Sequence, residues 1–288
     1  MDYSSIHQPV MQEEVLQAFD NKKLDNFLDG TLGLGGHALA LLQAHPELKT
    51  YYACDKDLEV RGLVEERLAE YEKKLCFQHM SFLDMLTYLK ENNLENSLDG
   101  VLVDLGVSSY QLDQAHRGFS FRKEGDLDMR MDQSQGITAY EVVNKWSEKQ
   151  IDSIIWKWGQ DRKSRVIAKA IVDYRQKKKI ETSLELGDII ENAVPRSGKM
   201  HPATRAFQAI RIAVNQELEE LQDFLKQIFT FLKPGGRLVA ISFHSLEDGI
   251  VKQAFKEASG KSFIDEFGVF RKSENRLAHI ISKKPMVP

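Results

Sequence analysis

The sequence predicts an α/β protein with a doubly wound, mostly parallel sheet and an inserted helical domain. Short apolar segments alternate with segments of helical period over the first hundred residues, and this alternation returns near the C-terminus. Chains with this order of elements form parallel sheets that are covered by helices on both faces. Between the two parts, from about 113 to 205, the period is helical and no buried strand is recognisable.

The first part of the chain contains four candidate strands. Each is a short run that contains Val, Leu, Tyr or Phe, as buried strands of parallel sheets do. The segments between them have apolar residues at helical spacing. We expect strands at 26–29, 50–54, 75–78 and 98–105, and helices at 36–44, 58–73 and 85–92.

The rest of the chain divides into the insertion and the return to the α/β pattern. Helical segments of the insertion are expected at 139–146, 148–158, 166–175 and 184–193, separated by loops with Gly and Pro. After it we expect a long helix over 203–232 that an interruption can divide, a turn at 233–236, a strand at 237–243 and a helix at 245–258. Segments 267–271 and 277–282 are expected to form a closing pair of strands. The predicted domains are therefore 1–112 with 206–288 for the α/β part, and 113–205 for the insertion.

The composition is that of a soluble globular protein, with 42% hydrophobic and 28% charged residues. No apolar run is long enough to span a membrane, and the N-terminal MDYSSIHQPVMQEE does not have the pattern of a secretory signal. Cys54 and Cys76 form no CxxC pair and the eight histidines fall in no metal-ligand spacing, so we expect neither a disulfide nor a metal site. The reducing cytoplasm is the expected compartment.

The net charge of −4 argues against a surface that is basic all over. One segment differs, since 156–179 contains nine Lys or Arg residues and two Asp residues. Such a run is either a solvated helix face or a local surface for a polyanion, and charge alone leaves both interpretations open.

A glycine-rich loop, Asp29-Gly30-Thr31-Leu32-Gly33-Leu34-Gly35-Gly36-His37, follows the first expected strand. Glycines let the backbone turn tightly and approach a ligand, and the helix that follows offers free N–H groups. Asp55 ends the second strand, 22 residues after Gly33. This is close to the spacing at which an acidic residue binds ribose hydroxyls, although a solvated loop acid has the same sequence pattern. Dinucleotides and S-adenosylmethionine both contain this ribose.

Three details favour S-adenosylmethionine. The pattern Gly33-x-Gly35-Gly36 is not GxGxxG, because its third glycine comes too early. The carboxylate of Asp29 leads into the loop and suits a cationic ligand better than a pyrophosphate. The fourth strand ends in the polar cluster Asp104-Leu105-Gly106-Val107-Ser108-Ser109, where a transferable methyl group and its acceptor can meet.

Seven segments together carry a resemblance to a known family. In chain order they are HQPV from His7, DGTLGLGGHA, VDLGVSSYQLD, RGFSFR, LDMRMD, HPATRAFQAIRIAVNQELEEL and KPGGRLVAISFHSLED. Any one of them can arise by chance, whereas the ordered set is specific. The chain resembles the RsmH (MraW) family of 16S ribosomal RNA cytosine-N4 methyltransferases from about residue 7 to its end.

The resemblance implies a Rossmann-like class I methyltransferase fold with an inserted helical domain that recognises RNA. It implies S-adenosylmethionine as the cofactor and 16S rRNA in the 30S small ribosomal subunit as the partner, with methylation of a cytosine in the decoding region. The sequence is also compatible with a homodimer. Phe82 is expected either as an aromatic wall for the adenine or as an ordinary core residue. By motif, the cofactor-binding positions are Gly35, Gly36, His37, Asp55, Phe82, Asp104 and Gln111.

The chemistry of the expected reaction suggests the catalytic candidates. A cytosine N4 amino group is a weak nucleophile because its lone pair is delocalised into the ring, so an acceptor for its N–H and accurate positioning should supply much of the rate. Many amino methyltransferases place an Asp/Asn-Pro-Pro-aromatic turn at this point, and Asp104-Leu105-Gly106 occupies the equivalent strand end without the prolines. Asp104 is the first candidate, and Asp113, His244 and Asp248 are second. A helix-capping or core role for His244 and a first-turn charge for Asp248 are the alternatives.

The segment Arg117-Gly118-Phe119-Ser120-Phe121 has two interpretations. Its phenylalanines either stack on a flipped base or form a structural loop clasp. Arginines that can reach phosphates are Arg117, Arg130, Arg205 and Arg211, although Arg211 fits a helix-to-helix salt bridge equally well.

Three other functions share part of the pattern. One is an S-adenosylmethionine-binding RNA-binding or ribosome-assembly protein with weak or no catalysis. It is suggested by Gly249, where the family usually has Arg, and by the end at Pro288, where the family usually continues into a basic tail. A nicotinamide-dependent oxidoreductase would share the sheet and Asp55 but not the glycine spacing. A small-molecule or DNA methyltransferase fits less well, because the helical insertion with its basic run favours a large polyanionic substrate.

Overall fold

The computed structural model describes residues 9–196, 198, 200–260, 262–264, 270–272, 276–282 and 284–287. The chain forms two compact units, of which the first consists of Met1–Gly106 and Leu218–Pro288 and the second of Val107–Glu217. The insertion expected at 113–205 lies inside the second unit.

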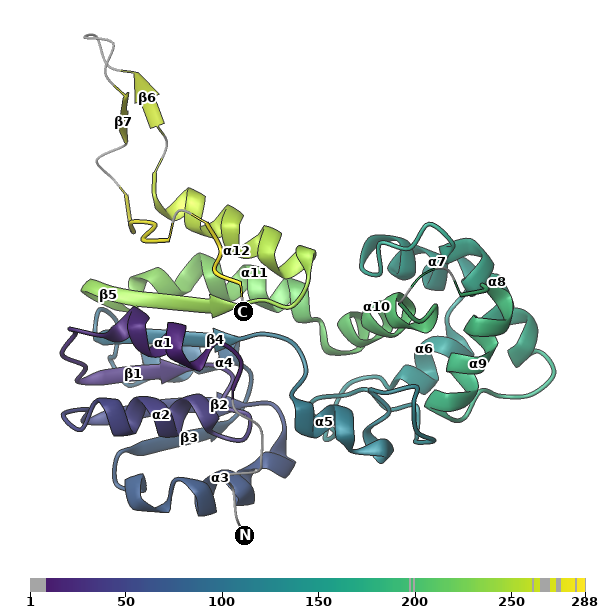
Figure 1. The fold of residues 1–288 in the computed structure, drawn as a ribbon, viewed down its shortest axis with the longest axis horizontal. Coiled ribbons are helices and arrows are strands. Elements are labelled where there is room, and N and C mark those ends of the chain that lie inside the picture. The colour runs from purple at the N-terminus through teal and green to yellow at the C-terminus, as the bar shows by residue number, and fades with distance from the viewer. Residues whose placement is uncertain are drawn as a thin grey trace. The chain divides into compact units, whose positions relative to one another are not determined.

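The first unit contains a five-stranded sheet in which every pairing is parallel (Figure 1). Its order, β3-β2-β1-β4-β5, reverses direction between β1 and β4, which confirms the predicted doubly wound sheet. In such sheets the ligand binds outside the carboxyl ends of the strands, at the point where the order reverses. The strands are β1 (Asn26–Asp29), β2 (Thr50–Asp55), β3 (Leu75–His79), β4 (Leu98–Asp104) and β5 (Leu232–Ile241).

Helices cover both faces of this sheet. Successive residues of a strand point to opposite sides, so each strand has side chains to bury on both faces. On one side, Phe19 of α1 (Gln12–Phe19) meets Phe27 of β1 edge-on at 4.9 Å, and α1 packs on α2 (Gly36–Ala44). On the other side, Leu28 lies in one cluster with buried residues of α4 (Phe82–Glu91) and α11 (Glu217–Gln227). Gly100 of β4 has no room for a side chain, since a Cβ there would lie 2.5 Å from the Phe27 ring.

The remaining elements of the first unit correct two predictions. The helix expected at 58–73 is divided into η2 (Leu58–Val60), α3 (Arg61–Arg67) and η3 (Ala69–Tyr71). The segment expected as a turn, 233–236, lies inside β5, where the pairing register shifts between Leu98 and Gly100 of β4. Residues 233–236 are accommodated as an irregularity of the strand. Within it Gly235 has φ 84°, a conformation that favours glycine.

The C-terminal part confirms one expected element and corrects another. α12 (Ser245–Ala258) has the predicted bounds. The two-stranded antiparallel pair is β6 (Ser262–Ile264) with β7 (Phe270–Lys272), and 277–282 forms no strand, so that half of the expected pair was wrong. The segment 267–269 lies outside the described residues.

The second unit is helical, as the sequence predicts. In its described part (107–196, 198 and 200–217) the only extended pairing is a single antiparallel bridge between Asp126 and Thr182. Thr138, Ser147 and Thr182 begin helices as side-chain caps, and the apolar faces of the helices form one core cluster. The helices are α5 (Ser109–Asp113), η4 (Ala115–Arg117), α6 (Ala139–Lys145), α7 (Glu148–Lys157), α8 (Ser164–Arg175), α9 (Ser183–Ala193) and α10 (Ala203–Asn215).

The long helix expected at 203–232 is interrupted. Gln216 adopts φ 53° between α10 and α11, and η5 (Ile228–Thr230) follows α11. Within the ranges that the structure describes, no helix is both long and apolar enough to cross a membrane.

Candidate active site

The glycine-rich loop follows β1 at the point where the strand order reverses. Gly33 and Gly35 have φ 51° and 72°, in the left-handed region that glycine adopts without strain. The Gly35 N–H donates to Leu32 O at 2.8 Å and the Leu32 N–H donates to Cys54 O at 3.1 Å, so the loop is held against β2. The sequence thereby brings the N-terminus of α2, with Gly36 and His37, to the carboxyl edge of the sheet.

Asp55, at the end of β2, binds the glycine-rich loop directly. Its Oδ2 accepts from the Gly33 N–H at 2.7 Å and its Oδ1 accepts from the Asp57 N–H at 2.8 Å. Burial raises the pKa of Asp55 above its usual value, against the effect of these two hydrogen bonds. Because a carboxylate has about four acceptor positions, Asp55 can fix the loop and still accept from a ligand hydroxyl.

Asp29, at the end of β1, is a buried carboxyl group with 1% of its surface exposed. It accepts from the Tyr51 hydroxyl at 2.9 Å and from the Thr31 N–H at 3.1 Å. Burial nevertheless raises the pKa of Asp29 to about 6.

Asp104 ends β4 on the other side of the reversal point. Its N–H donates to Thr31 Oγ1 at 2.6 Å, and its Oδ2 lies 3.7 Å from His37 Nε2. Burial first, and then the charges of Asp29 and Glu247, raise the pKa of Asp104 to about 7. Burial also lowers the pKa of His37 to about 4, so this imidazole is neutral at pH 7 and does not offset the negative charge. Among the described residues Asp104 Oδ1 is buried without a hydrogen-bond partner, which suits a cationic group of a ligand.

Phe82 is the first residue of α4, after the cap Ser81. Its half-buried ring meets Phe224 edge-on at 5.0 Å. A Cβ at Gly30 would lie 3.0 Å from Phe82 Cβ, so this glycine lets the loop approach Phe82. The Phe82 side chain therefore packs against the core through its ring and stays partly exposed beside the glycine-rich loop.

His244 and Asp248 lie at the start of α12, after β5. His244 Nδ1 accepts from the Glu247 N–H at 3.4 Å and Glu247 Oε2 accepts from the Phe243 N–H at 2.8 Å, so His244 caps the helix. Asp248 accepts from Lys252 Nζ at 2.6 Å as a first-turn acid. These are the structural roles given above as alternatives, and a catalytic role for either residue stays a prediction.

Glu247 belongs to the same group, although the sequence indicates for it only a place at the start of the helix over 245–258. It is 2% exposed and contributes to the raised pKa of Asp104. A carboxylate three residues after a capping residue is a recognisable sequence signal, and it could have identified Glu247 as a cap.

Gln111 and Asp113 are on α5 of the second unit. Gln111 is 5% exposed, and its Oε1 accepts from the Ser108 N–H at 3.0 Å in a reciprocal cap. Asp113 is exposed at the end of the helix. A cofactor contact of Gln111 and a catalytic role of Asp113 stay predictions.

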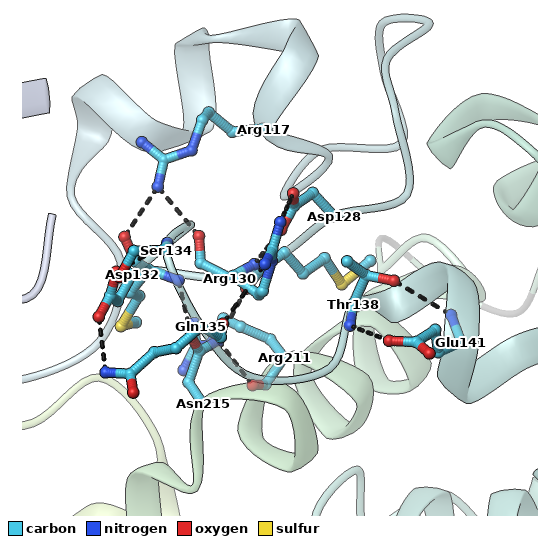
Figure 2. Close-up of polar contacts among 12 residues, drawn as sticks. Arg117, Asp128, Arg130, Asp132, Ser134, Gln135, Thr138, Glu141, Arg211 and Asn215 are labelled. Atoms are coloured by element: carbon cyan, nitrogen blue, oxygen red, sulfur yellow. Dashed lines mark hydrogen bonds and ion pairs between the residues drawn. The ribbon is translucent and has the colours of Figure 1, made fainter. Parts of the chain in front are cut away.

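The second unit also contains a polar network around the loop 128–135 (Figure 2). The fully buried Arg117 donates to Arg130 O at 2.9 Å and Met131 O at 3.1 Å. Asn215 Oδ1 accepts from the Met131 N–H at 2.7 Å, and its amide donates to Met129 O at 2.7 Å. Two side chains from distant parts of the unit therefore fix one loop.

These contacts decide between the interpretations of the arginines. The prediction that Arg117 reaches a phosphate was wrong, because its guanidinium is buried against backbone carbonyls. Arg211 pairs with both oxygens of Glu217 at 2.9 and 2.8 Å, which confirms the salt-bridge alternative. Arg130 pairs with both oxygens of Asp128, whereas Arg205 is exposed and donates to Gln160 O at 3.1 Å.

The two phenylalanines of the RGFSF segment pack against other side chains of the second unit. Phe119 is 7% exposed and lies 5.7 Å from the Arg117 guanidinium, so base stacking was a wrong expectation for this ring. Phe121 stacks on His201 at 4.4 Å and meets Phe207 edge-on at 5.1 Å. The loop-clasp interpretation fits both.

The fold and the edge residues define a class of protein. A doubly wound parallel sheet with a glycine-rich loop, an acid after the second strand and a half-buried acid at the reversal point is typical of α/β enzymes that bind an adenosine-containing cofactor. No group of three or more His, Cys, Asp or Glu side chains within the described ranges could hold a metal ion. The chain belongs to the MraW methylase family, whose model matches residues 4–288, and this confirms the resemblance found from the motifs.

Three similar proteins carry the name ribosomal RNA small subunit methyltransferase H. The one from Pelobacter propionicus is 48% identical over 255 residues, which cover 87% of this chain and 81% of the relative. Those from Caldicellulosiruptor bescii and Trichodesmium erythraeum are 44% and 41% identical. Each alignment covers 98% of this chain, with 92% and 91% of the respective relative.

Proposed function

We propose that this protein transfers a methyl group from S-adenosylmethionine to the N4 amino group of a cytosine in the decoding region of small-subunit ribosomal RNA. The observation that carries the proposal is the buried, unpartnered oxygen of Asp104 at the reversal point of the sheet, beside the glycine-rich loop. Family membership and the names of the relatives support the reaction class and the RNA substrate.

The residues at the edge fit S-adenosylmethionine. Gly35, Gly36 and His37 offer the backbone of a helix start, and Asp55 offers free acceptor positions for the ribose. Phe82 offers a half-buried ring for the adenine, and Asp104 offers a carboxylate for the cationic end. Gln111 remains a proposed contact from the second unit.

When bound, S-adenosylmethionine supplies an electrophilic methyl group. The proposed role of Asp104 is to accept a hydrogen bond from the target amino group and to take up the proton that leaves it. No covalent link to the enzyme is needed, and Cys54 is buried, where burial raises the pKa of its thiol far above the usual value. Asp113, His244 and Asp248 are second choices for the acceptor.

The insertion, 113–205, is proposed to recognise the RNA. Its basic segment, 156–179, lies on α7, α8 and the adjoining loops, and it presents Trp156 with 59% of its surface exposed. Arg165 and Lys169 of α8 have side chains that are 91% and 65% exposed. Exposed cations and an exposed aromatic ring in one segment suit phosphates and unstacked bases. An assembled 30S subunit in the cytoplasm is the proposed form of the substrate.

The reaction can be tested with small ribosomal subunits that lack the modification. Incubation with S-adenosylmethionine carrying a labelled methyl group, followed by nucleoside mass spectrometry, should give labelled N4-methylcytidine. Binding of the cofactor without any transfer would contradict the enzymatic proposal and favour the alternative of a non-catalytic assembly protein.

Replacement of Asp55 by Ala is expected to weaken S-adenosylmethionine binding at least about tenfold. The change removes the acceptor for the ribose, the hydrogen bond that holds Gly33 of the glycine-rich loop and the one that holds Asp57 after β2, and each lost hydrogen bond costs about 1–3 kcal/mol. Isothermal calorimetry measures the effect, with Glu65→Gln, an exposed acid of α3, as the control. An unchanged dissociation constant would contradict the ribose assignment.

A further inference from the structure

The side chain of Glu220 reaches from α11 to two loops at the carboxyl edge of the sheet. It is 10% exposed, and its Oε2 forms an ion pair with Lys56 Nζ. The same carboxylate lies close to Ser81 and to the Leu83 N–H in the first turn of α4. One acidic group is thus paired with the loop after β2 and lies beside the start of α4.

Both contacts flank residues that the proposed function assigns to the adenosine. Lys56 directly follows Asp55, and Phe82 stands between Ser81 and Leu83. A further hydrogen bond between the two strand ends joins His79 Nε2 to Lys56 O at 2.9 Å. The loops that carry Asp55 and Phe82 are therefore linked to one another and, through Glu220, to α11.

The physical effect of Glu220 on these loops follows from burial. Lys56 has only 23% of its side chain exposed, so its ammonium depends on a partner for the loss of hydration. The N–H groups in the first turn of a helix have no partner within the helix, and a carboxylate there stabilises the helix start. Loss of the Glu220 charge would loosen both loops without removing any group that contacts the ligand.

We propose that Glu220 is a positioning residue for cofactor binding, which holds Asp55 and Phe82 in place through Lys56 and the start of α4. The inference rests on the proposed binding of S-adenosylmethionine at this edge. It assigns to α11 a role in cofactor affinity rather than in methyl transfer itself.

The test compares Glu220→Gln with Glu219→Gln, which removes the same charge from the neighbouring, exposed position of the same helix. For Glu220→Gln the dissociation constant and KM for S-adenosylmethionine should rise about tenfold, as expected for the loss of a charged hydrogen bond. The kcat at saturating cofactor and the KM for small subunits should stay within about twofold of wild type, since a positioning residue changes binding rather than the chemical step. Glu219→Gln should behave as wild type.

Unchanged cofactor affinity of a folded Glu220→Gln variant would overturn the inference. A lower kcat with an unchanged KM would overturn it as well, because a purely structural defect lowers the active fraction.

If thermal melting shows that Glu220→Gln does not fold, Lys56→Gln provides the measurement, since it removes the charge of the partner and keeps a hydrogen-bond donor. It should raise the KM for the cofactor about threefold, as expected for a weakened rather than a lost contact, and an unchanged KM would overturn the inference. Failure of the wild type to bind S-adenosylmethionine would instead refute the proposed function.

Discussion

Replacement of Asp104 by Asn is expected to lower methyl transfer at least about 100-fold, the usual loss when a proton acceptor is removed. The amide has nearly the same shape, and the backbone N–H of residue 104 keeps its hydrogen bond to Thr31 Oγ1. The variant loses the carboxylate that accepts from the target amino group. Single-turnover transfer to small subunits at saturating S-adenosylmethionine measures the chemical step apart from cofactor affinity.

The raised pKa of Asp104 gives this prediction a pH signature. In the ligand-free protein the carboxyl group is largely protonated below pH 7, mainly because it is buried. A cationic ligand favours the ionised form, so binding below pH 7 must release a proton. Cofactor affinity should therefore fall by up to about tenfold for each pH unit below 7 and change little above it. Asp104→Asn should flatten this dependence, leaving a smaller effect centred near pH 6 from Asp29.

The control for both measurements is Asp223→Asn, which changes the same charge at an exposed position of α11. It should leave turnover and the pH dependence unchanged. Full activity of Asp104→Asn would show that the proton acceptor lies elsewhere, and Asp113, His244 and Asp248 would then be replaced in turn.

Most elements of the fold could be predicted because they depend on local sequence pattern. β1 and α12 have the predicted bounds, since each is a single apolar or amphipathic run with a clear start and end. The irregularity of β5 at 233–236 could not be predicted in the same way. Lys233-Pro234-Gly235-Gly236 has the composition of a turn, and only the pairing of β5 with a strand more than a hundred residues earlier shows that the strand continues through it.

The acids at the strand ends could be predicted for a related reason. Asp29, Asp55 and Asp104 each follow an apolar run, and parallel strands bring their carboxyl ends to one edge. Glu220 and Glu247 could not be assigned to that edge, because they reach it from helices whose packing is a tertiary property. Arg117 shows the same limit, since an arginine in a glycine-containing loop has the same local sequence whether it binds a phosphate or a backbone carbonyl.

Replacement of Arg117 by Met is expected to destabilise the second unit by about 3 kcal/mol. The guanidinium is fully buried and donates to the carbonyls of Arg130 and Met131, which would lose their donor. An unsatisfied buried polar group costs about 1–3 kcal/mol, and the contact of the guanidinium with the Phe119 ring is lost as well. Arg117→Lys should not restore stability, since a single ammonium does not reproduce the planar fork of donors.

The chain offers a selective probe for this effect, because its three tryptophans, Trp146, Trp156 and Trp158, all lie in the second unit. Their fluorescence during urea unfolding therefore reports on that unit, and calorimetric binding of S-adenosylmethionine reports on the first. For Arg117→Met the fluorescence midpoint should move to lower urea with an unchanged slope. The matched control is Arg205→Met, which removes an exposed arginine of the same unit that also bonds a carbonyl, and it should cost less than about 1 kcal/mol. A loss for Arg117→Met no larger than for this control would show that the buried guanidinium does not stabilise the loop 128–135.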